Sequence, residues 1–149
     1  MEKYKQLLND LAETLHIEAL ELDENNSACL IFDDSLLILF GFDELRNEIV
    51  VKSNMGSIED EKQPFIYERL LEANLFWHET AGSLFGVENG TVILSQRLNL
   101  SHLDRARFEN ELETFVNVTE YWADTLKTLK NSPQRSEKTV NSVPNFIRA

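Results

Sequence analysis

The sequence predicts an α+β domain in which three helices pack against an antiparallel, twisted sheet of about five strands. Apolar residues recur at spacings of three and four near both ends of the chain, which is typical of amphipathic helices. Short apolar runs separated by turn residues lie between 28 and 53, and an Asn-Gly pair separates two later apolar runs. The predicted order is therefore a helix, three strands, a helix, two strands and a final helix.

The first element is predicted to be a helix that covers the sheet with one face. Its apolar residues fall on a single stripe: Tyr4, Leu7, Leu8, Leu11, Ala12 and Leu15. The residues between them are mostly polar or charged and fall on the opposite side. This pattern predicts a helix that buries one face.

Three strands are predicted after an acidic connection, at residues 28–32, 36–42 and 46–53. Cys29 lies in the first strand, where a small buried residue is expected rather than a nucleophile, because reactive thiols need an exposed, electropositive setting. The second strand begins with an apolar run that lacks polar alternation, so both of its faces need cover. A small domain with few helices does not supply the second cover by itself, which indicates a partner.

Pro64 suits the first turn of a second helix that continues to about Trp77. The later half of this helix is apolar on nearly every side, which predicts burial on more than one side. The simplest second cover is another copy of the chain, because two-fold dimers are the commonest oligomers. The sequence thus predicts a homodimer, and the alternative is that this helix is the central core helix of a monomer.

Asn89 and Gly90 predict a β-hairpin, because both central residues of a type I′ turn need positive φ. Ser101 and Asp104 have the spacing of a capping box and predict the start of a long final helix. The apolar spacing of this helix continues to about Lys130.

Residues 131–149 have little periodicity and carry three basic residues against one acidic residue. They predict a flexible, solvated C-terminal tail that follows a domain of residues 1–130. The apolar pair Phe146 and Ile147 lies near the end of this tail, where docking stays open although an unstructured end is the prediction.

The net charge of −12 and the pI near 4.6 exclude two classes of partner. Such a surface repels the phosphates of nucleic acid and the headgroups of an anionic membrane. A single cysteine permits neither an internal disulfide nor a zinc ribbon. The sequence shows neither a signal peptide nor an apolar stretch long enough to span a membrane, so a cytoplasmic protein is expected.

Catalytic motifs are lacking in the sequence. The three histidines do not have metal-ligand spacing, and there is no phosphate-binding loop, dinucleotide fingerprint or acyl-transfer serine motif. The sequence therefore predicts neither an enzyme nor a cofactor or metal site. For the alternative of a small enzyme or ligand-binding domain, Asp33, Asp34 and His78 are the first positions to test, although nothing in the sequence joins them.

Binding of an apolar partner segment is better supported by the excess of apolar residues on a short, acidic chain. Two physical modes are available: an extended peptide adds to a sheet edge, or an apolar segment lies in a groove. The stripe of the first helix and the doubly apolar second strand are the candidate surfaces, unless both are simply core.

Three segments, at residues 70–77 (LLEANLFW), 81–84 (AGSL) and 90–98 (GTVILSQRL), resemble a signature of class I type III secretion chaperones, the Tir chaperone (CesT) family. The small acidic chain and the predicted order of helices and strands are also similar to that family. The resemblance covers roughly residues 1–130 and leaves the tail outside it.

The resemblance implies a homodimer that binds the N-terminal chaperone-binding segment of a secreted effector in extended form and keeps it competent for export. It implies neither ATP hydrolysis nor a cofactor. By position, the effector-binding residues are Leu8, Leu11, Leu15, Ile31, Leu37 and Leu39. The dimer-interface residues are Leu71, Asn74, Leu75, Phe76, Trp77 and Leu84.

Two alternatives stay open within this resemblance. Asn74 departs from the apolar stripe, and a buried amide with hydrogen-bond partners is favoured over contact with another chain. Some members of the family sequester a small regulatory protein and so control expression of the secretion genes. That role uses the same surfaces, and the sequence does not separate it from effector binding.

Overall fold

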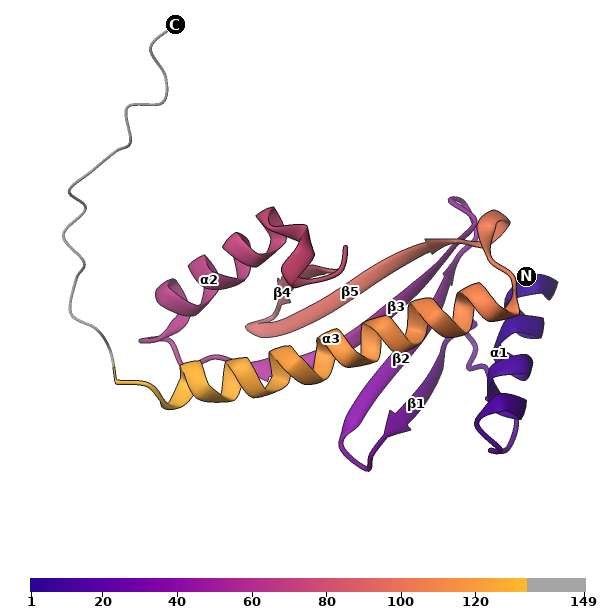
Figure 1. The fold of residues 1–149 in the computed structure, drawn as a ribbon, viewed down its shortest axis with the longest axis horizontal. Coiled ribbons are helices and arrows are strands. Elements are labelled where there is room, and N and C mark those ends of the chain that lie inside the picture. The colour runs from indigo at the N-terminus through magenta and orange to yellow at the C-terminus, as the bar shows by residue number, and fades with distance from the viewer. Residues whose placement is uncertain (134–149) are drawn as a thin grey trace, which may run out of the picture.

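Five antiparallel strands form one sheet, which three helices flank in the computed structural model (Figure 1). The structure describes residues 1–133. The elements are α1 (Glu2–Thr14), β1 (Ala28–Phe32), β2 (Leu36–Asp43), β3 (Glu48–Ser57), α2 (Gln63–Leu75), β4 (Leu84–Glu88), β5 (Thr91–Asn99) and α3 (Arg105–Asn131). The predicted fold class and element order are confirmed. Of the predicted tail, all but the first three residues lie outside the described part of the chain.

The strand order is β1-β2-β3-β5-β4, so β1 and β4 are the two edges of the sheet. Directly opposite residues share a face of the sheet. Leu30 pairs with Ile38 on the face that packs on the helices, which we call the inner face. Ile31 pairs with Leu37 on the opposite face, which we call the outer face. The alternation decides which half of the doubly apolar β2 enters the core.

The core lies between the inner face and the buried stripes of all three helices. Figure 1 shows the long α3 crossing in front of the strands, with α1 beside its N-terminal half and α2 near its C-terminal half. The largest fully buried side chains are Trp122, Tyr4, Phe40, Phe108 and Phe115. The predicted stripe of α1 is buried from Tyr4 to Ala12, whereas Leu15 lies beyond the helix end and is 38% exposed.

The tight turns agree with the residue types that form them. Asn89 and Gly90 both have positive φ (50° and 78°), as the predicted hairpin between β4 and β5 requires. Asp33 and Asp34 also have positive φ (48° and 59°) in the turn between β1 and β2. Asp tolerates this region better than most residues, since its short polar side chain bonds locally.

The predicted capping box at the start of α3 is wrong in detail. Asp104 is itself the N-cap, and its side chain accepts a hydrogen bond from the backbone N–H of Arg107 at 2.8 Å. Ser101 lies in a short 3₁₀ turn, Leu100–His102, that precedes the helix. Leu103 is buried between the turn and the cap in an extended conformation, which delays the helix start.

Tyr4 connects α1 to the chain that leads into β1. Its hydroxyl donates to the backbone oxygen of Asn26 at 3.1 Å, and its ring stacks on Phe42 with centroids 5.3 Å apart. Burial, helped by the negative charge of Asp23, raises the pKa of Tyr4 to about 12. In the unfolded chain a tyrosine has a pKa of about 10.

This difference predicts alkaline sensitivity. The unfolded state loses the Tyr4 proton first, so the contribution of the neutral phenol is complete below pH 10 and is lost as the pH rises through about 12. We expect Tyr4→Phe to flatten the fall of stability in this window, measured by urea unfolding at several pH values. Tyr121→Phe, at an exposed tyrosine of α3, is the matched control. An unchanged slope in Tyr4→Phe would contradict the assignment.

Candidate functional site

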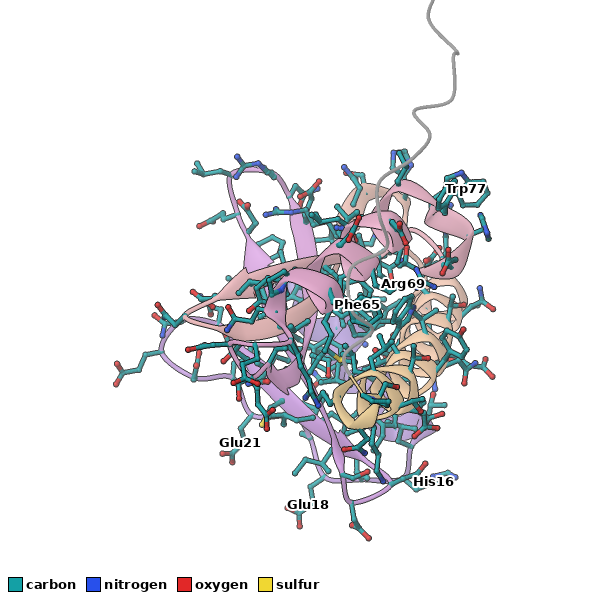
Figure 2. All side chains as sticks on the ribbon, turned by 90° about the vertical axis from the view of Figure 1, so that its left-hand side faces the viewer. His16, Glu18, Glu21, Phe65, Arg69 and Trp77 are labelled. Atoms are coloured by element: carbon teal, nitrogen blue, oxygen red, sulfur yellow. The ribbon has the colours of Figure 1, made fainter. Side chains whose placement is uncertain are left out.

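Exposed large apolar side chains are concentrated on α2, the turn after it and β4. Of the two on β4, Leu84 pairs with Ser95 on the outer side of the sheet, and Val87 lies beside α2. Seven large apolar side chains lie here, each between 49% and 74% exposed: Phe65, Leu71, Leu75, Phe76, Trp77, Leu84 and Val87. We call this set the α2–β4 surface. Figure 2 shows Trp77 at the outer edge of the molecule, at the opposite end of the view from His16 and Glu18. Clustered exposed apolar residues of this size mark interaction sites, whereas scattered ones do not.

Asn74 holds the two parts of the α2–β4 surface together. Its amide nitrogen donates to the backbone oxygen of Phe85 at 3.1 Å, and its amide oxygen accepts from the backbone N–H of Phe85 at 2.7 Å. The side chain therefore pairs with β4 as a neighbouring strand would. The expectation of a hydrogen-bonded amide is met within a single chain, so Asn74 supports this surface from behind.

The turn that carries Trp77 is anchored to α3. Trp122 is fully buried, donates its indole N–H to the backbone oxygen of Glu79 at 2.9 Å, and packs against Phe85 with centroids 4.9 Å apart. Arg69 pairs with the Glu79 carboxylate and lies 5.0 Å from the centroid of the Trp122 ring. This cluster fixes the turn Trp77–Glu79. Trp77 is therefore exposed on an ordered turn and not on a frayed helix end.

The outer face of the sheet has an apolar corner beside the free edge of β1. Ile31 is 61% exposed, and Leu37 and Leu39 are each 38% exposed. Cys29 pairs with Leu39 on the same face and is exposed, so its predicted burial is wrong. The register explains the error, because Ala28 takes the inner position. The sequence predicted that both faces of β2 are covered. Within the described part of the chain, its outer face is left uncovered.

A groove of about 480 Å³ lies between α1 and α3 and is closed below by β1. We call it the α1–α3 groove. Its lining is Leu11, Thr14, Leu15, Phe32, Ala106, Glu109, Asn110, Leu112, Glu113, Val116 and Asn117. Apolar side chains form the floor, and carboxylates and amides form the rim.

Arg105 connects α1 and α3 at one end of this groove. Its guanidinium bonds Glu13 at 2.9 Å, the Thr14 hydroxyl at 2.8 Å and Glu109 at 3.2 Å. The hydrogen bond with Glu13, then that with Glu109, raises the pKa of Arg105 above its ordinary value.

On the outer face, the hydrogen bonds from Arg46 hold the pKa of Asp43 below its usual range. Neither Arg105 nor Asp43 is poised for proton transfer.

The structure separates the six predicted effector-binding residues into three sets. Leu8 is 1% exposed and lies wholly in the core, so it does not offer a binding surface. Leu11 is 3% exposed but lines the floor of the α1–α3 groove beside the exposed Leu15. The remaining three, Ile31, Leu37 and Leu39, lie together on the outer face.

Five of the six predicted interface residues are part of the α2–β4 surface, and Asn74 lies directly beneath it. Sequence reasoning missed Phe65 and Val87, which complete this surface. Phe65 follows Pro64 in the first turn of α2, and Val87 lines an apolar pocket of about 200 Å³ between α2 and β4. Val87 is recognisable in the sequence as an apolar residue of β4. The sequence does not show that α2 leaves half of this side chain exposed.

The residues of the catalytic alternative are not brought together. Asp33 and Asp34 form the turn of the β1–β2 hairpin at one edge of the sheet. His78 lies in the turn before β4, at the other edge. Within residues 1–133 there is no cluster of three His, Cys, Asp or Glu side chains able to hold a metal ion. None of the helices in this range combines the length and apolar character needed to cross a membrane.

Comparison with known proteins identifies relatives for most of the chain. A Chlamydia pneumoniae protein, CPj0713/CpB0740, is 29% identical over 82 residues, a match that spans 54% of this chain and 62% of the relative. Solved structures that share the fold include two chains from protein complexes. They are a chain of the ExsC–ExsE complex (TM-score 0.72, 23% identity, 84% of this chain and 94% of that one) and a chain of the HopA1–SchA chaperone–effector complex (TM-score 0.70, 20% identity, 82% and 94%).

The family model adds a match to the sequence itself. It aligns with residues 6–123, from the first helix to the second half of the last one. This range includes the α2–β4 surface, the outer face and the α1–α3 groove. The chain therefore belongs to the Tir chaperone protein (CesT) family.

Proposed function

We propose that the protein is a non-enzymatic chaperone that acts as a homodimer in the bacterial cytoplasm. It binds the N-terminal segment of a type III secreted effector and keeps that segment competent for secretion. One observation carries this proposal: a single chain leaves separate apolar surfaces uncovered, on α2 and β4 and on the outer face of the sheet. Membership of the Tir chaperone family supports it.

The α2–β4 surface is assigned to the dimer. It is built from a helix and an edge strand whose positions Asn74 and Trp122 fix, so the surface is already formed before association. A two-fold interface uses the same patch on both subunits, and an apolar patch is complementary to itself. Leu71, Leu75 and Trp77 are its most exposed members and its expected centre.

The outer face and the edge of β1 are assigned to the client segment. An extended peptide that adds to a free edge gains main-chain hydrogen bonds, and its alternate side chains reach one face of the sheet. Ile31 and Leu39 are placed to receive such side chains, and the α1–α3 groove lies on the other side of β1. A chaperone that binds an extended segment through main-chain hydrogen bonds and apolar side-chain contacts needs no catalytic group.

Co-purification from the native host tests this proposal. We expect a secreted effector to co-purify with the tagged protein and to fall at least tenfold with the double variant Ile31→Glu/Leu39→Glu. An unpaired carboxylate in an apolar interface costs about 2 kcal/mol or more, and 1.4 kcal/mol is tenfold in affinity. Leu45→Glu, at a 96% exposed leucine in the turn after β2, is the matched control.

The identity of the captured protein separates the two roles that the family resemblance left open. A large secreted effector supports export, whereas a small regulatory protein supports sequestration in control of gene expression. If equal amounts of the same protein bind to the wild type and the double variant, the outer face is not the client surface. If neither kind of protein binds, the proposed function is wrong.

A further inference from the structure

The α1–α3 groove joins an apolar floor to an acidic rim. Leu11 and Leu112 are each 3% exposed at the floor, and Phe32 closes it from the sheet. Glu109 and Glu113 stand on the rim. Arg105 pairs with Glu109, whereas within the described residues Glu113 makes no salt bridge. An occupant that matches both features carries apolar side chains next to a cation.

The chain contains such a segment in residues 134–149. Its charged residues are three basic and one acidic, whereas residues 1–133 carry a net charge of −14. The segment ends in the apolar pair Phe146 and Ile147, followed directly by Arg148. The segment therefore combines apolar side chains with a neighbouring cation, as the floor and the rim of the groove require.

Charge distinguishes the groove from the other uncovered surfaces. On the outer face, the carboxylates Asp43 and Glu48 already pair with Arg97, and Lys52 adds a further cation beside Leu39. The pocket beside the α2–β4 surface holds about 200 Å³, less than half the volume of the groove, and lies in the proposed dimer interface. The α1–α3 groove combines an apolar floor with the carboxylate of Glu113, which makes no salt bridge within residues 1–133.

The length of the segment is sufficient. The groove residues on α3 lie between 106 and 117, and α3 ends at Asn131. At about 1.5 Å per helical residue, the helix end is roughly 20 to 40 Å from the groove. The 14 residues from 132 to 145 span up to about 45 Å when extended, at roughly 3.3 Å per residue. The extended length of the chain is therefore sufficient for the apolar pair to reach the groove of its own chain.

We propose that residues 134–149 dock in the α1–α3 groove, with Phe146 and Ile147 on its floor and Arg148 beside Glu113. A client segment that enters the groove then has to displace the chain's own segment, a consequence that rests on the proposed function. Docking protects the apolar floor from solvent when no client is bound. It also favours clients whose apolar residues outcompete this pair.

Paramagnetic broadening in the full chain tests the docking. A nitroxide is attached at Ser142→Cys, in a Cys29→Ser background that removes the other thiol. We expect selective loss of amide signal at Leu15, Glu113 and Val116. The signals of Leu71 and Leu84, on the α2–β4 surface, are expected to keep their intensity.

Two variants define the chemistry of the docking. Glu113→Lys on the rim and Phe146→Ser/Ile147→Ser in the segment should each restore at least half of the lost signal. Glu120→Lys, which makes the same charge change at an exposed position of α3 outside the groove, should leave the broadening unchanged. Weaker broadening at high salt is expected as well, because part of the attraction is between charges.

Failure of this proposal is distinct from failure of the proposed function. Uniform broadening, absence of broadening, or broadening centred on the outer face or the α2–β4 surface would overturn the docking. The docking is also wrong if neither Glu113→Lys nor the double serine variant reduces the broadening at the groove residues. Dimerisation and client co-purification are measured without the label. Their outcome therefore tests the proposed function independently of the docking.

Discussion

Trp77→Glu is expected to convert the proposed dimer into a monomer. Trp77 is 71% exposed in a single chain and lies at the outer edge of the molecule, among the expected central residues of the α2–β4 surface. In a two-fold dimer the substitution places one unpaired carboxylate from each subunit in the interface. At about 2 kcal/mol per carboxylate, association weakens by about a thousandfold. Light scattering after size exclusion should show the mass fall from about twice 17.2 kDa to that of one chain.

Leu75→Glu gives a second, independent test of the same interface. Leu75 is 74% exposed on the last turn of α2, and its substitution should dissociate the dimer as Trp77→Glu does. Leu45→Glu is the control, since it introduces the same charge far from α2, in the turn after β2. Circular dichroism verifies that each variant is folded. If both variants still dimerise, the interface lies elsewhere, and a wild type that is monomeric at micromolar concentration contradicts the dimer itself.

Trp122→Ala is expected to cause a large loss of folding stability. The side chain is fully buried against Phe85, and its indole N–H bonds the backbone oxygen of Glu79. Removing a buried tryptophan typically costs about 3–5 kcal/mol, because the cavity left behind collapses only partly. For a chain of this size the melting temperature should fall by about 10 °C. Urea and thermal unfolding measure both quantities.

Two companion variants separate packing from hydrogen bonding at this site. Trp122→Phe keeps most of the apolar bulk and loses the hydrogen bond to Glu79, which should cost about 1–3 kcal/mol. Tyr121→Ala, at the neighbouring position of α3 where the ring is 58% exposed, should cost less than about 1 kcal/mol. Equal losses in Trp122→Ala and Tyr121→Ala would show that Trp122 does not anchor the turn before β4.

Dimerisation and folding stability are therefore expected to respond to different tryptophans. Trp77 lies on the surface and Trp122 in the core, yet both belong to the region in which α2 meets β4. The anchoring cluster of Arg69, Glu79 and Trp122 holds the turn from which Trp77 projects. A loss of packing at Trp122 is thus expected to disturb the dimer indirectly, whereas Trp77→Glu leaves the core intact.

The order of elements was predictable because it depends on local signals. Helical spacing marks the stripe of α1, and Asn89 with Gly90 marks the last hairpin. The all-round apolar character of α2 correctly indicated side chains that one chain does not cover, including Leu71 and Leu75. These features are encoded in a few neighbouring residues, so no knowledge of distant contacts is needed.

The site was predictable only in part, because exposure depends on register and on neighbouring elements. Leu8 and Leu15 belong to the same stripe, yet one is core and the other lies beyond the helix end. Cys29 and Ala28 are adjacent small residues in one strand, and only the pairing with β2 shows which of them faces the helices. A shift of one residue in register would exchange the two faces.

By itself, the sequence determined the fold class and the apolar excess of α2 and β2, and from this excess it predicted a partner. Only the tertiary structure decided which apolar residues stay uncovered, and that Leu11, Phe32 and Leu112 meet as the floor of one groove. The physical reason is that periodicity defines the faces of a single helix or strand. Whether a given face is covered depends on the packing of elements that are distant in the chain.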